Sequence, residues 1–226
     1  MTKNRKSRRA KQRILTVDVG GTHVKFEVSD QKERREFNSG PNLSAKRMVS
    51  EVKRLTADWS YDVVSIGYPG LVVRNRIVAE PHNLGHGWTD FDFGKAFGCP
   101  VKIINDAAMQ ALGSYKGGKM LFLGLGTGLG TAMIVDGVIE PMELAHLPYR
   151  KGKTFEEYVG IAGLQRFGKK KWRKHVVDVI KRLMVALEPE YVVLGGGNVN
   201  KLGKLPPRVR KGENDKAFTG GRKLWS

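Results

Sequence analysis

Two glycine-rich segments have the composition of phosphate-binding loops. Residues 18–22 read DVGGT and residues 125–130 read LGTGLG. Glycine lets backbone N–H groups approach phosphate oxygens, a threonine hydroxyl adds a donor, and an aspartate at a strand end can hold a metal-bound water. The alternative is that each segment is only a tight turn. The phosphate-binding candidates are Asp18, Gly20, Gly21, Thr22, Lys25, Gly126, Thr127 and Gly128.

Two further pairs have side chains suited to sugar chemistry. Asn105 and Asp106 stand between a predicted strand and a predicted helix, where a carboxylate can accept a proton from a hydroxyl. Helix capping is the alternative, since both residue types are preferred N-caps. Glu143 and His146, three residues apart, can bind adjacent sugar hydroxyls or form an ordinary surface pair. Zinc is disfavoured, because no thiolate or second histidine lies at ligand spacing.

The residues around the glycine-rich segments do not match the two common nucleotide-binding loops. A Rossmann loop needs a helix after its glycines, whereas an alternating segment follows Gly130. The segment 113–119 approaches a Walker loop, but Met120 replaces the required serine or threonine. Three glycines, Gly195, Gly196 and Gly197, follow a buried strand. They could carry an adenine or a phosphate chain, or form a bare turn.

The elements that must position these residues recur in two halves. Apolar runs and alternation predict strands at 14–19, 24–28, 62–67, 101–104, 120–125, 131–135, 138–139 and 191–194. Helices are predicted over 44–57, 107–116 and 174–187, with Ser44 as a cap. Asp136-Gly137 is a two-residue hairpin signal. The repeated order predicts two related α/β lobes around a cleft: 14–118 and 119–226, with the last segment packing back on the first lobe.

Composition excludes several classes and suggests a type of partner. The 226 residues have a hydrophobic content of 40% and an aromatic content of 8%, so the chain is neither wholly disordered nor collagen-like. The net charge is +18. No apolar run reaches membrane-spanning length and no signal sequence is visible, which favours a cytoplasmic protein. A single cysteine, Cys99, excludes an internal disulfide. The basic excess lies in a predicted disordered tail, 1–13, and in the last third, and it would attract polyanions.

The order and spacing of these motifs resemble the sugar kinases of the ROK family. The matching strings are DVGGT at 18–22, GYPG at 67–70, HNLGHGW at 82–88, INDA at 104–107, GLGTGLG at 124–130, ELAH at 143–146 and LGGG at 194–197. The resemblance spans about residues 14–200, with a fainter echo at 214–221. It implies the actin-like, hexokinase-like ATPase fold, which is related to ribonuclease H. Within the family it points to the polyphosphate glucokinases.

The resemblance also implies roles. Asp106 would be the general base on the 6-hydroxyl of glucose or a related hexose, and the two loops would hold the transferred phosphoryl group. Mg²⁺ would assist without direct side-chain ligands, with Asp18 binding it through water. A homodimer is expected. Ala145 departs from the usual glycine, and the family's cysteine-rich zinc element is absent. The implied sugar-binding residues are Asn83, Asn105, Glu143, His146 and Glu157, with Glu156 as second choice to Glu157.

The sequence leaves the donor open. Polyphosphate would suit a basic groove, and ATP would suit an adenine site at residues 195–197. A non-catalytic protein that binds polyphosphate or nucleic acid would also explain the charge, with Asp106 dispensable. A ROK repressor would need a helix-turn-helix, for which the tail is too short, so nucleic acid is expected only as an incidental partner of the tail. The groove residues are Lys151, Lys153, Lys169, Lys170, Lys171, Arg173 and Lys174.

Overall fold

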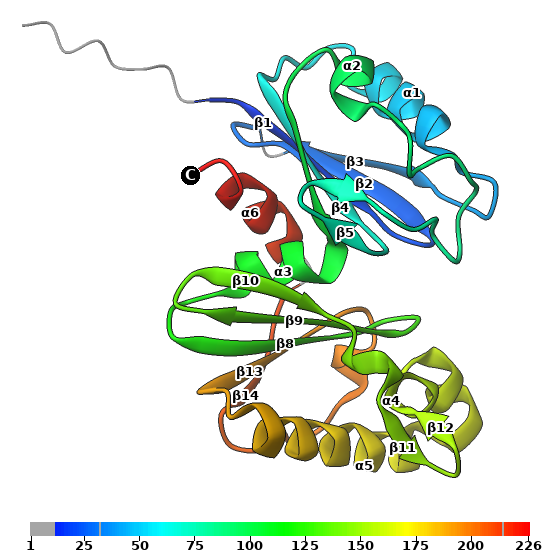
Figure 1. The fold of residues 1–226 in the computed structure, drawn as a ribbon, viewed down its shortest axis with the longest axis vertical. Coiled ribbons are helices and arrows are strands. Elements are labelled where there is room, and N and C mark those ends of the chain that lie inside the picture. The colour runs from blue at the N-terminus through cyan, green and yellow to red at the C-terminus, as the bar shows by residue number, and fades with distance from the viewer. Residues whose placement is uncertain (1–11, 32, 214) are drawn as a thin grey trace, which may run out of the picture.

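The computed structural model describes residues 12–226 except 32 and 214, so most of the predicted tail lies outside the described residues. Two five-stranded sheets, one from each half of the chain, face each other across a layer of two helices, α3 (Asp106–Ser114) and α6 (Lys216–Lys223). Figure 1 shows the N-terminal sheet above this layer and the C-terminal sheet below it. The arrangement follows from apolar strand faces, each of which must be covered by another element.

The N-terminal sheet has the strand order β3-β2-β1-β4-β7. The first three strands form an antiparallel meander, β4 pairs in parallel with β1, and β7 pairs in parallel with β4. Of the three meander strands, the sequence did not predict the edge strand, which has a single apolar residue, Phe37. The bounds are β1 (Ile14–Val19), β2 (His23–Val28), β3 (Arg34–Asn38), β4 (Val63–Tyr68) and β7 (Val101–Asn105).

Alternation along these strands gives the sheet one apolar and one polar face. The side chains of Val17 and Phe26 point to the apolar face, which α1 (Ala45–Leu55) and α2 (Phe93–Phe97) cover. Ser44 caps α1 as predicted, accepting a hydrogen bond from the backbone N–H of Arg47. The opposite face points to α6 and carries Thr16, Asp18, Lys25, Glu27, Arg34 and Ser65. The strand period therefore sends charged side chains into the space between the halves.

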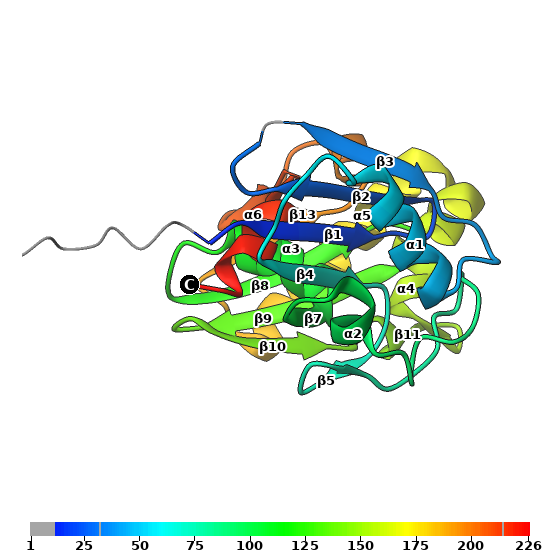
Figure 2. The same ribbon diagram turned by 90° about the horizontal axis from the view of Figure 1, so that it is seen from above.

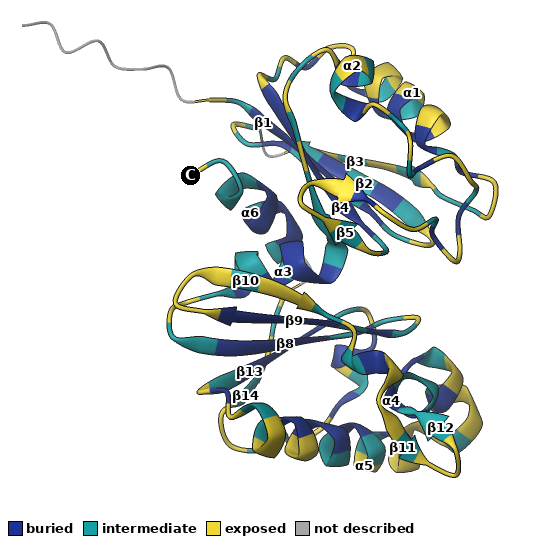
Figure 3. Cartoon of the chain, in the orientation of Figure 1, coloured by how far each residue is buried: buried dark blue, intermediate teal, exposed yellow. Residues whose placement is uncertain are grey.

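The C-terminal sheet repeats this topology with the order β10-β9-β8-β13-β14. Leu121 and Leu123 face α5, whereas Phe122 and Ala132 face α3. Both faces of the central strands are therefore buried, as Figure 3 shows for β8 and β9. The bounds are β8 (Lys119–Leu125), β9 (Leu129–Val135), β10 (Val138–Met142), β13 (Tyr191–Gly195) and β14 (Val209–Lys211).

The long helix α5 (Ile161–Leu187) extends far beyond the predicted helix 174–187. It is interrupted at Gly168, whose φ of 69° is non-helical. Its basic first part has little apolar periodicity, but Trp172 is fully buried and its indole N–H donates to the carbonyl of Val159 at 2.8 Å. That bond ties α5 to α4 (Phe155–Val159), a short helix that the sequence did not reveal.

The layer between the sheets is held by close contact of helix backbones. A Cβ on Gly113 would lie 1.7 Å from the carbonyl oxygen of Lys216, and one on Gly220 would lie 1.8 Å from that of Met109. The C-terminal segment also bonds to the N-terminal sheet: Ser65 Oγ donates to the carbonyl of Gly221 at 2.6 Å and accepts from the Trp225 indole at 2.9 Å. Figure 1 places α6 between β1 and α3, both of which it contacts, and the three elements overlap in Figure 2, which is seen from above.

The remaining elements are short connectors. They are β5 (Val72–Val73), β6 (Arg76–Ile77), η1 (Leu144–His146), β11 (Pro148–Arg150), β12 (Lys153–Thr154) and η2 (Val199–Lys201). In the part of the chain that the structure describes, we find no helix with the length and apolarity that a membrane crossing requires.

Candidate active site

A cavity of about 370 Å³ opens between the two halves of the molecule. Both sheets and both central helices contribute to it, so it lies where a movement of the halves would open or close it. Its lining residues are Asp18, Gly20, Lys25, Arg34, Asp106, Ala107, Gln110, Gly124, Gly126, Gly128, Gly130, Gly196, Gly197, Ala217 and Phe218.

Two carboxyl groups from separate elements, those of Asp18 and Asp106, line this cavity. Asp18 stands near the end of β1 and Asp106 begins α3, where its Oδ1 accepts the N–H of Ala107 at 2.7 Å. Burial, together with the nearby charge of Asp18, raises the pKa of Asp106 to about 7. Burial likewise raises the pKa of Asp18 to about 6, against the opposing charges of Lys25 and Arg34. One carboxyl group can thus accept a proton near neutral pH.

The first glycine loop is a tight strand-to-strand turn. The N–H of Gly20 donates to the carbonyl of His23 at 3.0 Å, and Ser39 Oγ donates to the carbonyl of Gly20 at 2.6 Å. Lys25 lies directly opposite Asp18 in the antiparallel register. Gly20 and Lys25 line the cavity, whereas Gly21 and Thr22 are exposed beside it.

The second glycine loop and the triple glycine form one continuous surface. Asn198 Nδ2 donates to the carbonyl of Gly126 at 2.9 Å, and the N–H of Asn198 donates to that of Leu125 at 3.0 Å. Gly196 has a φ of 85°, and a Cβ there would lie 2.5 Å from the Leu125 carbonyl oxygen. Gly126, Gly128, Gly196 and Gly197 line the cavity. Gly195 is buried behind them and Thr127 is exposed.

None of the predicted sugar-binding residues, all of which the structure describes, is among the residues that line the cavity. Asn105 caps α3: its Oδ1 accepts the N–H of Ala108 at 3.1 Å and its Nδ2 donates to the carbonyl of Gly70 at 3.1 Å. Asn83 is exposed next to Gly21. Glu143 and His146 are exposed as well, with 3.7 Å between Oε2 and Nε2. The charge of Glu143 nonetheless contributes to the raised pKa of Asp106, after burial and the charge of Asp18.

Of the two neighbouring glutamates on α4, the structure places Glu156 at the cavity rim. Glu156 Oε2 accepts the N–H of Leu129 at 3.2 Å, beside Gly128. Glu157, our first choice from sequence, is occupied elsewhere: it forms a capping box with Thr154 and an ion pair with Lys153 at 2.6 Å. A Thr-x-x-Glu spacing is the sequence signature of a capping box, so this structural role was readable at residues 154–157.

Sequence reasoning missed Arg34, Gln110 and Phe218. Arg34 and Phe218 come from β3 and α6, two elements that lack a clear apolar pattern. Gln110 lies one turn after Asp106 on α3, so helical periodicity alone could have pointed to it.

The predicted basic groove lies apart from the central cavity. As far as the described residues show, none of its lysines or arginines lines that cavity. Lys153 is paired with Glu157, and Arg173 donates through Nε to the carbonyl of Lys201 at 2.6 Å. Arg173 and Lys174 line a separate cavity of about 400 Å³ on the outer side of α5.

The side chains of the cavity fit a hydrated magnesium ion better than a directly ligated metal. No group of three or more histidine, cysteine or acidic side chains gathers at one point among the described residues. Asp18 offers one carboxylate in the cavity, next to a loop suited to phosphate. Mg²⁺ keeps several waters and commonly uses one or two carboxylates plus substrate phosphates.

Comparison with known proteins gives a consistent set of relatives. A model of the ROK family matches residues 14–140. A polyphosphate glucokinase of Mycobacterium tuberculosis is 29% identical over 215 residues, covering 84% of this chain and 80% of its own.

Two solved structures of kinases have the same fold. The inorganic polyphosphate/ATP-glucomannokinase of Arthrobacter sp. strain KM aligns with a TM-score of 0.81 at 22% identity, over 95% of this chain and 98% of its own. A ROK family glucokinase of Streptomyces griseus, in complex with glucose and AMPPNP, aligns with a TM-score of 0.71 at 17% identity, over 93% and 98%. The predicted actin-like, hexokinase-like fold is thereby confirmed.

Proposed function

The chain belongs to the ROK family, and from this premise we propose that it is a sugar kinase. The reaction would transfer a phosphoryl group from polyphosphate, with or without ATP as a second donor, to the 6-hydroxyl of glucose or a related hexose. The observation that carries the proposal is the meeting of Asp106 with two glycine loops, one from each half, in a single cavity.

Asp106 has the properties of a general base for this transfer. Its carboxylate accepts the proton of the sugar hydroxyl while that oxygen bonds to the terminal phosphorus. The bridging P–O bond breaks, and the donor leaves one phosphate shorter. A pKa of about 7 suits a base at neutral pH, and burial, its main cause, is what a water-excluding cleft produces.

The phosphoryl group would lie between the loops. The backbone at Gly20, Gly126 and Gly128 offers close approach, and Lys25 adds a positive charge opposite Asp18. Mg²⁺ bound to the donor would neutralise phosphate charge, with Asp18 holding it through water.

The sugar would enter from the side where Asn83 meets Gly21 and where Glu156 meets Gly128. We propose Glu156, in place of Glu157, as the α4 glutamate that contacts the sugar, together with Glu143 and His146. These carboxylate and imidazole groups can accept and donate hydrogen bonds to vicinal hydroxyls.

The relatives support both donors. The M. tuberculosis relative is named a polyphosphate glucokinase, and the Arthrobacter kinase is named for both polyphosphate and ATP. The net charge of +18 favours a polyanionic donor. An ATP-dependent ROK hexokinase is the second candidate, supported by the triple glycine in the cavity lining.

A product assay tests the proposal. Purified protein is incubated with glucose, Mg²⁺ and either long-chain polyphosphate or ATP, and glucose 6-phosphate is measured. Formation with polyphosphate supports the first candidate, and formation with ATP alone supports the second. Tight polyphosphate binding without turnover on glucose, mannose or N-acetylated hexoses would replace the kinase with a polyanion-binding protein.

A further inference from the structure

We propose that Arg34, which lies over the ring of Phe218, makes one end of the cavity a site for an inorganic phosphate chain and closes it to a stacked nucleotide base. The inference rests on the proposed function, because it concerns the donor of that same reaction. It assigns donor selectivity to one pair of side chains, neither of which belongs to a glycine loop or to the carboxyl pair.

The strand register gives the cavity two distinct ends. Asp18 pairs with Lys25 next to the first loop, where Asn83 also lies. Arg34 pairs with Glu27, two residues further along β2 and away from that loop. Two strand residues span about 7 Å, a distance that a short phosphate chain can bridge. Arg34 therefore stands on the side away from the sugar entrance, where the rest of the donor must lie.

Arg34 is held in place from two sides. Its guanidinium carbon lies 4.1 Å from the centroid of the Phe218 ring on α6, and its Nη2 donates to Glu27 Oε2 at 3.1 Å. Phe218 is 2% exposed, although it lines the cavity, while the Arg34 side chain remains 40% exposed. The arginine thus covers the ring and presents its own edge to solvent.

The charge balance at this end favours an anion. The carboxylate of Glu27 accepts hydrogen bonds from Arg34 and also from Arg222, so one negative group serves two guanidinium groups. Lys25 adds a further positive charge along the same face. A phosphate chain brings charge to every unit, and a guanidinium can donate two parallel hydrogen bonds to phosphate oxygens.

The same geometry disfavours a nucleoside. An aromatic ring in a cavity lining is the usual platform for a planar base, and Phe218 supplies such a ring. Its accessible face is already occupied by the Arg34 guanidinium in a cation–π contact. A base that stacked there would have to displace the arginine from both Phe218 and Glu27.

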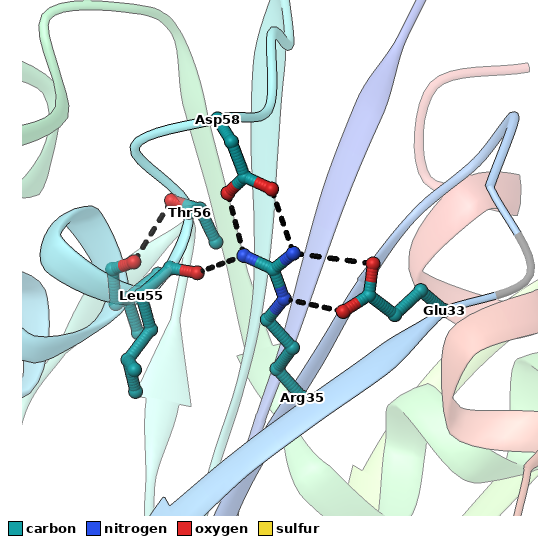
Figure 4. A network of polar contacts seen from close by, with 6 residues as sticks. Glu33, Arg35, Leu55, Thr56 and Asp58 are labelled. Atoms are coloured by element: carbon teal, nitrogen blue, oxygen red, sulfur yellow. Dashed lines mark hydrogen bonds and ion pairs between the residues drawn. The ribbon is translucent and has the colours of Figure 1, made fainter.

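Arg34→Gln is the direct test, with Arg35→Gln as the matched control. The two changes remove the same charge from adjacent residues of β3, but Arg35 points to the opposite face of the sheet. There it lies over Trp59. Figure 4 shows its ion pairs with Glu33 and Asp58. The measured quantity is kcat/KM for polyphosphate and for ATP, with glucose saturating and thermal unfolding recorded for each variant.

In Arg34→Gln we expect kcat/KM with polyphosphate to fall about tenfold, while kcat/KM with ATP changes less than about twofold or rises. The ratio of the two should stay within about twofold of wild type in Arg35→Gln. An equal fall with both donors, or no fall with polyphosphate, would overturn the proposal. If Arg34→Gln does not fold, Arg34→Lys takes its place: it keeps the charge but not the planar cover, so a rise with ATP supports the proposal and an unchanged ratio overturns it.

Binding of inorganic tripolyphosphate separates this inference from the proposed function. Its dissociation constant is measured calorimetrically for wild type and Arg34→Gln, without sugar. If the wild-type protein phosphorylates no sugar, and Arg34→Gln binds tripolyphosphate about tenfold more weakly than wild type, the kinase is refuted and the Arg34 site is supported. Equal affinity of the two proteins would refute the site whatever the turnover.

Discussion

The crossing of α3 and α6 leaves no room for a methyl group at Gly113. In Gly113→Ala the new Cβ would lie 1.7 Å from the carbonyl oxygen of Lys216, where an ordinary contact needs at least 3.4 Å. The shortfall is 3.4 − 1.7 = 1.7 Å, and the obstacle is backbone, which no side-chain rotation can relieve. The two helices must therefore separate, or α6 must leave its place.

The size of the effect follows from what α6 buries. Overpacking of this kind costs about 1–3 kcal/mol. If α6 undocks, Phe218 and Ala217, which are 2% and 1% exposed, lose their burial, and the phenylalanine alone is worth about 1.5–3 kcal/mol. Replacing a helical glycine returns up to about 1 kcal/mol through helix propensity. We expect the free energy of unfolding to fall by about 2–4 kcal/mol.

Urea unfolding followed by tryptophan fluorescence measures this change, and hydrogen exchange at residues 216–226 reports undocking of α6 directly. Gly94→Ala is the control, since it also replaces a helical glycine but its Cβ would meet nothing closer than 3.5 Å. That variant should be neutral or stabilised by up to about 1 kcal/mol. A Gly113→Ala protein within about 1 kcal/mol of wild type, with unchanged exchange in α6, would refute the close crossing.

Three further predictions concern the acidic groups. Because Asp106 must be deprotonated to act and its pKa is about 7, kcat/KM should rise with pH through an apparent pKa near 7; a flat profile between pH 5 and pH 9 would contradict this role. Folding raises the pKa of that carboxyl group above its ordinary value, so the wild-type protein loses stability as the pH rises toward 7. In urea unfolding, Asp106→Asn should therefore be at least about 1 kcal/mol more stable than wild type at pH 8 but not at pH 4. Glu156→Gln should raise the KM for sugar at least about fivefold with little change in stability. Glu157→Gln should lower the free energy of unfolding by about 1 kcal/mol, because it breaks the capping box, and should leave the KM for sugar within about twofold. The reverse pattern would exchange the roles of the two residues.

Strong local patterns made much of the fold predictable. The stripe of Met48, Val49 and Val52 predicted α1, and the Asp136-Gly137 turn predicted the β9–β10 hairpin; both are confirmed. The repeated strand order predicted two related lobes, and the two sheets indeed share one topology. In these segments the local pattern and the tertiary packing demand the same structure.

The missed elements are those whose structure depends on distant partners. The α6 sequence contains two adjacent glycines, which lower helix propensity, yet Gly220 and Gly221 are what allow contact with Met109 and Thr16. The β3 strand is mostly charged, and its register is set by pairing with β2. Arg34 and Phe218 belong to these two elements, so their meeting in the cavity could not be predicted from either segment.

The site was predictable in its centre and less so at its rim. Asp18, Asp106 and most of the loop glycines were predicted together, and the structure gathers them in one cavity. Their roles stay predictions. Choosing between Glu156 and Glu157 as the glutamate at the cavity required knowing which of them caps a helix. The Thr154 spacing identifies Glu157 as the capping residue once the short helix is known.

The central claim is that Asp106 performs the chemistry of phosphoryl transfer, and one measurement tests it most directly. Glucose 6-phosphate formation is compared for wild type and Asp106→Asn, with glucose binding measured in parallel by calorimetry. Asparagine keeps the size of the side chain but cannot accept the proton, so kcat should fall at least about 10²-fold while the dissociation constant for glucose stays within about threefold. A variant that retained more than about a tenth of wild-type kcat would contradict the account.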